Sequence, residues 1–90
     1  MNDAAAETLA LQALTWLAAD SDGFGRFLGE SGVDPAMLQA GDLGPELLAG
    51  VLDHILADEA RLLAFCAAVE IPANLPARAR RHLPGANPED

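Results

Sequence analysis

The chain has no lysine and no tyrosine, and it contains one cysteine, Cys66. A single cysteine excludes a disulfide within the chain and a zinc site built from several cysteines. Residues that favour strands are also few, with three valines, two isoleucines and two threonines. Because a sheet needs many such side chains, their scarcity argues against one and predicts an all-α protein.

Positive charge is scarce as well. Five arginines stand against 14 Asp and Glu, which gives a net charge of −9. Nonspecific affinity for nucleic acid comes from basic side chains that displace counterions from phosphate, so this balance argues against such a partner. The basic side chains gather in one place, at Arg78, Arg80 and Arg81. Weak nucleic-acid binding through this patch is therefore kept as an alternative function.

Long apolar runs are missing too. The longest, such as LALQALTWLAA, extend for about a dozen residues, which is too short to span a bilayer. The first residues, MNDAAAETLA, lack the positive charges that open a secretory signal. The sequence therefore predicts a cytoplasmic protein that does not bind membranes.

Alanine and leucine, which favour helices, dominate the 51% of residues that are hydrophobic. Apolar residues recur at helical spacing in segments that Gly, Pro or Asp separate. We expect helices over residues 3–19, 23–31, 35–40, 45–56, 59–69 and about 75–83. The predicted fold is all-α, a compact orthogonal bundle of five or six short helices. It forms one domain over residues 1–83, and residues 84–90 are expected to be a disordered tail.

Capping residues indicate where several helices begin and end. Asp3 is expected to be the N-cap of the first helix, and Asp58 the N-cap of the helix that begins at Glu59. Gly32 is placed at the C′ position of the second helix, where glycine is favoured. Cys66 belongs to an apolar stripe at helical spacing, so we expect a buried small hydrophobe rather than a reactive thiol.

A shift of 38 residues aligns the chain with itself without gaps, and five of the 25 aligned pairs are identical. The matching positions include Leu9 and Leu47, Leu14 and Leu52, Leu17 and Ile55, Asp20 and Asp58, and Phe27 and Phe65. This pattern predicts two similar helix–turn–helix halves, in which Asp20 and Asp58 have the same role. One continuous helix over residues 45–70 is the alternative, and the repeat favours a break at Asp58.

A metal site or an enzyme site is the first alternative to a structural role for the polar residues. His54 and Asp58 are spaced i, i+4 and are followed by Glu59, so they would present ligands on one helix face. Further ligands are missing nearby, and the repeat aligns His54 with Trp16, which binds no metal. We therefore expect His54 at the surface or on a flank, and we predict no catalytic residue, no cofactor and no metal.

The candidate interaction residues are Leu11, Trp16, Arg78, Arg80 and Arg81. Trp16 stands beside the main apolar stripe of the first helix, and tryptophan is enriched where protein partners bind, so Trp16 and Leu11 are candidates to anchor a partner. The leading hypothesis is a small non-enzymatic interaction or regulatory module that binds an unknown protein through a helical surface. The same surface allows a homodimer.

Three segments, LALQALTWLAAD, GRFLGESGVDP and LADEARLLAFCAA, give the chain a resemblance to a known family. It is similar to domain-of-unknown-function family 3572, a bacterial family of small proteins. The likeness extends over roughly residues 7–84, and its most specific part is DEA at 58–60 followed by LAFC at 63–66. The resemblance implies a short, soluble, helical protein and carries over no activity, cofactor or catalytic residue.

Overall fold

A computed structural model describes residues 1–32, 36, 41 and 44–84 of the chain. These residues form helices joined by turns, and they contain no strand, so the all-α prediction is confirmed. The helices are α1 (Asp3–Ala18), α2 (Ser21–Ser31), α4 (Pro45–Leu56), α5 (Glu59–Val69) and α6 (Leu75–Arg80). The helix predicted over residues 35–40 lies outside the described residues except for Ala36, and residues 85–90 of the predicted tail also lie outside them.

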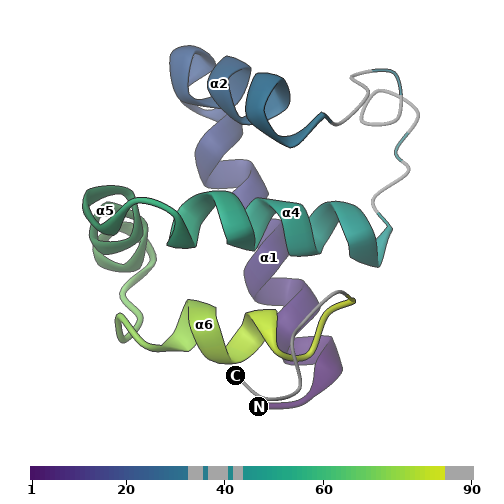
Figure 1. The fold of residues 1–90 in the computed structure, drawn as a ribbon. Helices are drawn as coiled ribbons and strands as arrows, with labels where there is room; N and C mark the ends of the chain where they lie inside the picture. Colours follow the sequence, from purple (N-terminus) through teal and green to yellow (C-terminus); the bar gives the residue numbers. More distant parts are fainter. Residues whose placement is uncertain (33–35, 37–40, 42–43, 85–90) are drawn as a thin grey trace.

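Helices α1 and α4 cross at the centre of the molecule, and the other helices surround this crossing (Figure 1). Helix α2 packs at one end of α1 and α6 at the other, while α5 follows the last turn of α4. The core is made of apolar side chains from all five of these helices and from the turn after α6. Its fully buried larger members are Phe27, Phe65, Leu52, Ile55, Val51 and Pro76.

The starts of two helices correct predictions. Asn2, not Asp3, is the N-cap of α1, because its extended backbone places Oδ1 2.8 Å from the amide nitrogen of Ala5. Asp3 takes the first helical position, and its Oδ1 lies 2.9 Å from Nδ1 of His82. Helix α2 begins at Ser21 rather than at residue 23, since Asp20 already has the extended backbone of an N-cap.

Two other predicted helix boundaries are confirmed, and the predicted end of the last helix is wrong. Asp58 accepts a hydrogen bond from the amide of Arg61 at 3.2 Å, as an N-cap does, and α4 and α5 are separate helices. Gly32 follows α2 with φ of 70°, in the left-handed region that glycine tolerates best. Helix α6 ends at Arg80, three residues before the predicted Leu83, because the last residues form a turn instead.

The 38-residue repeat holds in the helix bounds, but the predicted shared role of Asp20 and Asp58 is only partly correct. Both residues precede a helix with an extended backbone, yet only the side chain of Asp58 accepts a capping hydrogen bond, and that of Asp20 makes none to α2. Helices α1 and α4 end at Ala18 and Leu56, and α2 and α5 extend over residues 21–31 and 59–69, so these bounds all differ by 38. Glu70 is the counterpart of Gly32, and its φ of 58° is likewise left-handed. Each half is therefore one helix–turn–helix unit with the same register. The two units pack against each other and place both apolar stripes in one core.

Candidate functional site

The side chains of Leu11 and Trp16 line one groove between α1 and the C-terminal end of α5, with a volume of about 510 Å³. Leu11 is 39% exposed there. The residues that line the groove are uncharged: Thr8, Leu11, Gln12, Thr15, Trp16, Ala19, Ala68 and Val69. The structure thus brings together the two apolar residues that the sequence singled out.

Two threonines of the groove keep their hydroxyl groups occupied within α1. The hydroxyl of Thr8 donates to the carbonyl of Ala4, and that of Thr15 donates to the carbonyl of Leu11, both at 3.0 Å. Because these hydroxyls already have a partner one turn earlier, an apolar ligand can cover them at a low desolvation cost.

Trp16 also belongs to the core. Its ring is half-buried and lies with its centroid 5.6 Å from that of Phe65, in a tilted arrangement. Aromatic pairs at this distance contribute about 1 kcal/mol beyond the area that they bury. Trp16 therefore fixes the wall of the groove to α5, and a substitution there would perturb the fold as well as the surface.

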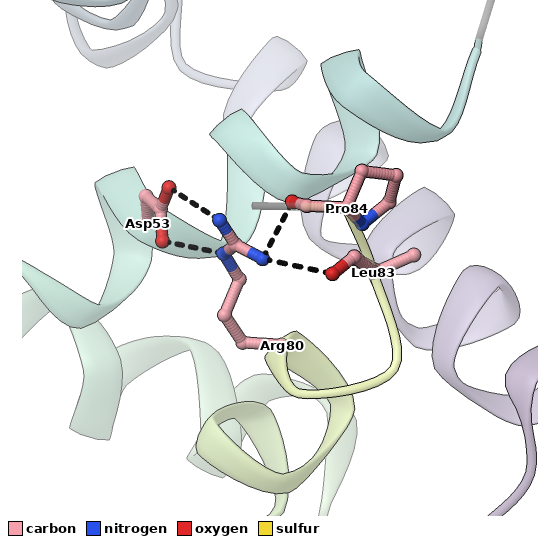
Figure 2. A network of polar contacts seen from close by, with 4 residues as sticks. All are labelled: Asp53, Arg80, Leu83 and Pro84. Atoms are coloured by element: carbon pink, nitrogen blue, oxygen red, sulfur yellow. Dashed lines mark hydrogen bonds and ion pairs between the residues drawn. The ribbon is translucent and has the colours of Figure 1, made fainter. Parts of the chain in front are cut away.

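The three arginines of the predicted patch do not act together in the structure, because Arg80 is paired with another helix while Arg78 and Arg81 are exposed. Arg80 faces Asp53 of α4, with its Nε 2.6 Å from Oδ1 and its Nη2 3.2 Å from Oδ2 (Figure 2). Its Nη1 donates to the carbonyls of Leu83 and Pro84, at 3.3 and 2.9 Å. Arg80 thus joins α6 to α4 and holds the turn after α6.

Arg78 and Arg81 are exposed, and none of the arginines of α6 and its turn lines the groove of Leu11 and Trp16. The five candidate residues therefore do not form one site.

His54 is buried, against our expectation that it lies at the surface. Only 7% of the residue is exposed, and its ring packs edge-on against Phe27 with centroids 5.2 Å apart. Its Nδ1 lies 3.3 Å from Oε2 of Glu30, whereas Nε2 has no hydrogen-bond partner. The neighbouring Val51 and Ile55, both on the apolar face of α4, were the signal that could have shown this burial.

The metal alternative finds no support in the described part of the chain. Within residues 1–32, 36, 41 and 44–84, no three His, Cys, Asp or Glu side chains gather to hold an ion. Asp58, the second ligand of that alternative, caps α5 instead.

A smaller pocket of about 300 Å³ lies where the turn between α1 and α2 meets the turn between α4 and α5. It is lined by Trp16, Leu17, Ala19, Asp20, Gly23, Arg26, His54 and Arg61. Nη1 of Arg61 donates to the backbone carbonyl of His54, which holds this side chain against the end of α4. Sequence reasoning missed this pocket, because its residues come from four segments that only the packing of the two halves brings together.

The pKa of His54 is lower than its ordinary value. Burial is the main cause, and the positive charge of Arg61 adds to it, while Glu30 opposes both. Since the native pKa is lowered, the unfolded chain binds the proton more readily than the native protein. The free energy of unfolding should therefore decrease as the pH falls from about 6.5, the ordinary value, to the native pKa of His54.

We expect this decrease to be measurable by urea denaturation at a series of pH values. In His54→Gln the free energy of unfolding should depend less on pH between the native pKa of His54 and about 6.5, because the group that titrates is gone. His82→Gln is the matched control: His82 is exposed at the surface near Asp3 and should leave the slope due to His54 in place. An unchanged slope in His54→Gln would contradict the assignment.

Cys66 is buried on α5, as its place on the apolar stripe predicts. Burial raises the pKa of its thiol, which keeps the thiol protonated and unreactive near neutral pH. Phe65 is buried beside it, and Leu62 and Val69 of the same stripe are partly buried against the core. The thiol thus contributes packing to this fold.

Comparison with known proteins identifies a family. The family model described as "Protein of unknown function (DUF3572)" matches residues 3–86 of the 90-residue chain. The chain belongs to this family. The match covers all the helices described above, so α1, α2, α4, α5 and α6 belong to the fold of a DUF3572 member. No curated protein and no solved structure matches the chain.

The family resemblance drawn from the three sequence segments is thus confirmed. Among the described residues, none of the helices has both the length and the apolar character needed to cross a bilayer.

Proposed function

We propose that this protein is a non-enzymatic interaction module that binds an apolar helical segment of a partner protein in the groove between α1 and α5. The observation that carries the proposal is the exposure of Leu11 beside Trp16 in a groove whose lining has no charged residue. Apolar grooves on helical proteins commonly accept the apolar face of an amphipathic helix. Trp16 offers the rigid aromatic surface that is typical of binding hot spots.

The charge of the protein favours a partner with basic flanks. The net charge is −9, and the exposed Glu7 and Glu70 directly adjoin the lining residues Thr8 and Val69 in the chain. The negative charge of these glutamates beside the groove would attract a basic segment of the partner and speed its binding. A second copy of this chain carries the same negative charge, so the electrostatics favour a different protein over a homodimer.

A synthetic amphipathic helix with leucines on one face and lysines on the other tests the proposal. Trp16 is the only tryptophan, so its fluorescence reports binding at the groove directly. We expect the peptide to change this fluorescence, and Leu11→Gln to weaken its affinity about tenfold, as loss of one anchoring side chain does. The same peptide with glutamates in place of lysines should bind far more weakly.

Leu63→Gln is the matched control, because Leu63 is another leucine of this protein that is strongly exposed, at 49%, and it does not line the groove. Equal affinities for wild type and Leu11→Gln would rule out the groove as the binding site. If sedimentation shows a homodimer that Leu11→Gln dissociates, then a second copy is the occupant and the proposed partner is wrong.

The alternative of a metal-binding protein or enzyme that uses His54 and Asp58 is less favoured. The side chain of His54 is directed toward Glu30 and Phe27, and Asp58 is engaged at the start of α5. The alternative of nucleic-acid binding is weakened because Arg80 is paired with Asp53. A cytoplasmic location stays a prediction.

A further inference from the structure

The pocket between the two helix turns has the features of a ligand site. It has walls from both halves of the repeat, contains basic groups from α2 and α5, and has an apolar side formed by Trp16 and Leu17. We propose that it binds a small organic carboxylate, with the carboxylate group near Arg26 and Arg61 and the apolar part against Trp16.

Arg26 and Arg61 supply the positive charge. Arg61 is held in place through the hydrogen bond from Nη1 to the His54 carbonyl, and its Nη2 lies 3.9 Å from Oδ2 of Asp58. Arg26 is exposed, and no described residue forms an ion pair or a hydrogen bond with it. Both arginines line the pocket together with His54. A planar guanidinium group matches a carboxylate in geometry.

The acidic groups around the pocket limit the charge of the ligand. Asp20 is part of the lining, and its carboxylate lies close above Gly23, where a Cβ would be 2.8 Å from Oδ2. Glu30 is engaged with Nδ1 of His54. With the negative charge of Asp20 nearby, a singly charged carboxylate fits better than a doubly charged phosphate.

The two halves differ at positions that line the pocket. Gly23 is the counterpart of Arg61 under the 38-residue shift, and Trp16 is the counterpart of His54. The first half therefore contributes Gly23, which has no side chain, and the aromatic ring of Trp16. The second half contributes the basic group of Arg61 and the polar ring of His54. A volume of about 300 Å³ suits a molecule of the size of a small aromatic acid.

Benzoate is a suitable probe, and benzamide is its neutral counterpart of nearly the same shape. Trp16 lines the pocket, so a fluorescence titration reports binding. We expect benzoate to change the fluorescence at millimolar concentrations or below, and phenyl phosphate and benzamide to bind more weakly. Arg26→Gln should lower the affinity for benzoate about tenfold, the loss expected when one charge-assisted hydrogen bond is removed.

Two control variants locate the effect. Arg78→Gln removes an exposed arginine of α6 that lies outside the pocket lining, and it should leave the affinity for benzoate unchanged. Leu11→Gln alters the groove but not the pocket, so it should also leave that affinity unchanged. This second control separates the carboxylate site from the proposed partner groove, which shares Trp16.

The proposal is overturned if benzoate causes no change, if benzamide binds equally well, or if Arg26→Gln binds benzoate like the wild type. Loss of benzoate binding in Leu11→Gln would also overturn it, because the probe would then occupy the groove. Arg26 is exposed and has no ion pair or hydrogen bond of its side chain among the described residues, so we expect Arg26→Gln to fold normally, and its circular dichroism spectrum checks this.

Discussion

Phe65→Ala should lower the free energy of unfolding by about 3–5 kcal/mol, the usual cost of removing a large aromatic side chain from a core. Phe65 is fully buried, and its ring packs against that of Trp16. A domain of this size has a total stability of about 5–10 kcal/mol, so the variant should lose a large fraction of its stability. Urea denaturation followed by circular dichroism measures the change.

Phe27→Ala provides the matched comparison, because Phe27 is the counterpart of Phe65 in the other half and is also fully buried. If the two halves contribute equally to one core, the two variants should lose similar stability, within about 1 kcal/mol. Leu63→Ala is the surface control and should change stability by about 0.5 kcal/mol or less, since Leu63 is 49% exposed. A small loss in Phe65→Ala alone would show that the halves do not form one cooperative core.

Arg80→Ala should destabilise the protein by about 1–2 kcal/mol. The variant loses a two-bond contact with Asp53 and leaves the carbonyls of Leu83 and Pro84 without their donor (Figure 2). The Arg80 side chain is 15% exposed but that of Asp53 is 58% exposed, so solvent weakens the ion pair, and the expected loss lies below that of a buried pair. Thermal and urea denaturation give the value.

A double-mutant cycle with Asp53→Asn isolates the pair itself. We expect a coupling energy of about 0.5–1 kcal/mol between Asp53 and Arg80, with the rest of the loss arising from the turn after α6. Arg81→Ala is the control, because Arg81 is an exposed neighbour and has no ion pair among the described residues. Equal losses in Arg80→Ala and Arg81→Ala would mean that the contacts of Arg80 contribute nothing measurable.

Local chemistry explains why so much of the helical structure follows from the sequence. The N-cap of α5 at Asp58 and the left-handed Gly32 after α2 depend on interactions within a few residues. The start of α1 shows where such reasoning stops, because Asn2 and Asp3 are both good caps. Asn2 is the N-cap because its side chain accepts the hydrogen bond from Ala5, while the side chain of Asp3 pairs with His82, a residue far along the chain.

The candidate sites depend more on long-range packing. Trp16 could be selected from the sequence because it lies beside the apolar stripe of α1, and Leu11 was selected with it, but their groove also needs Ala68 and Val69 of α5. The arginine patch was a reasonable prediction from local charge. The structure separates Arg80 from the other two arginines, because the packing of α6 on α4 pairs Arg80 with Asp53, 27 residues away in the chain.

The sequence by itself determined the helical class, the break at Asp58 and the 38-residue register of the two halves, because spacing and capping act within a few turns of helix. Only the tertiary structure decided that His54 is buried, that Arg80 is paired and that a basic pocket lies between the turns. These features depend on which helix faces meet, and a linear pattern of apolar residues leaves that choice open.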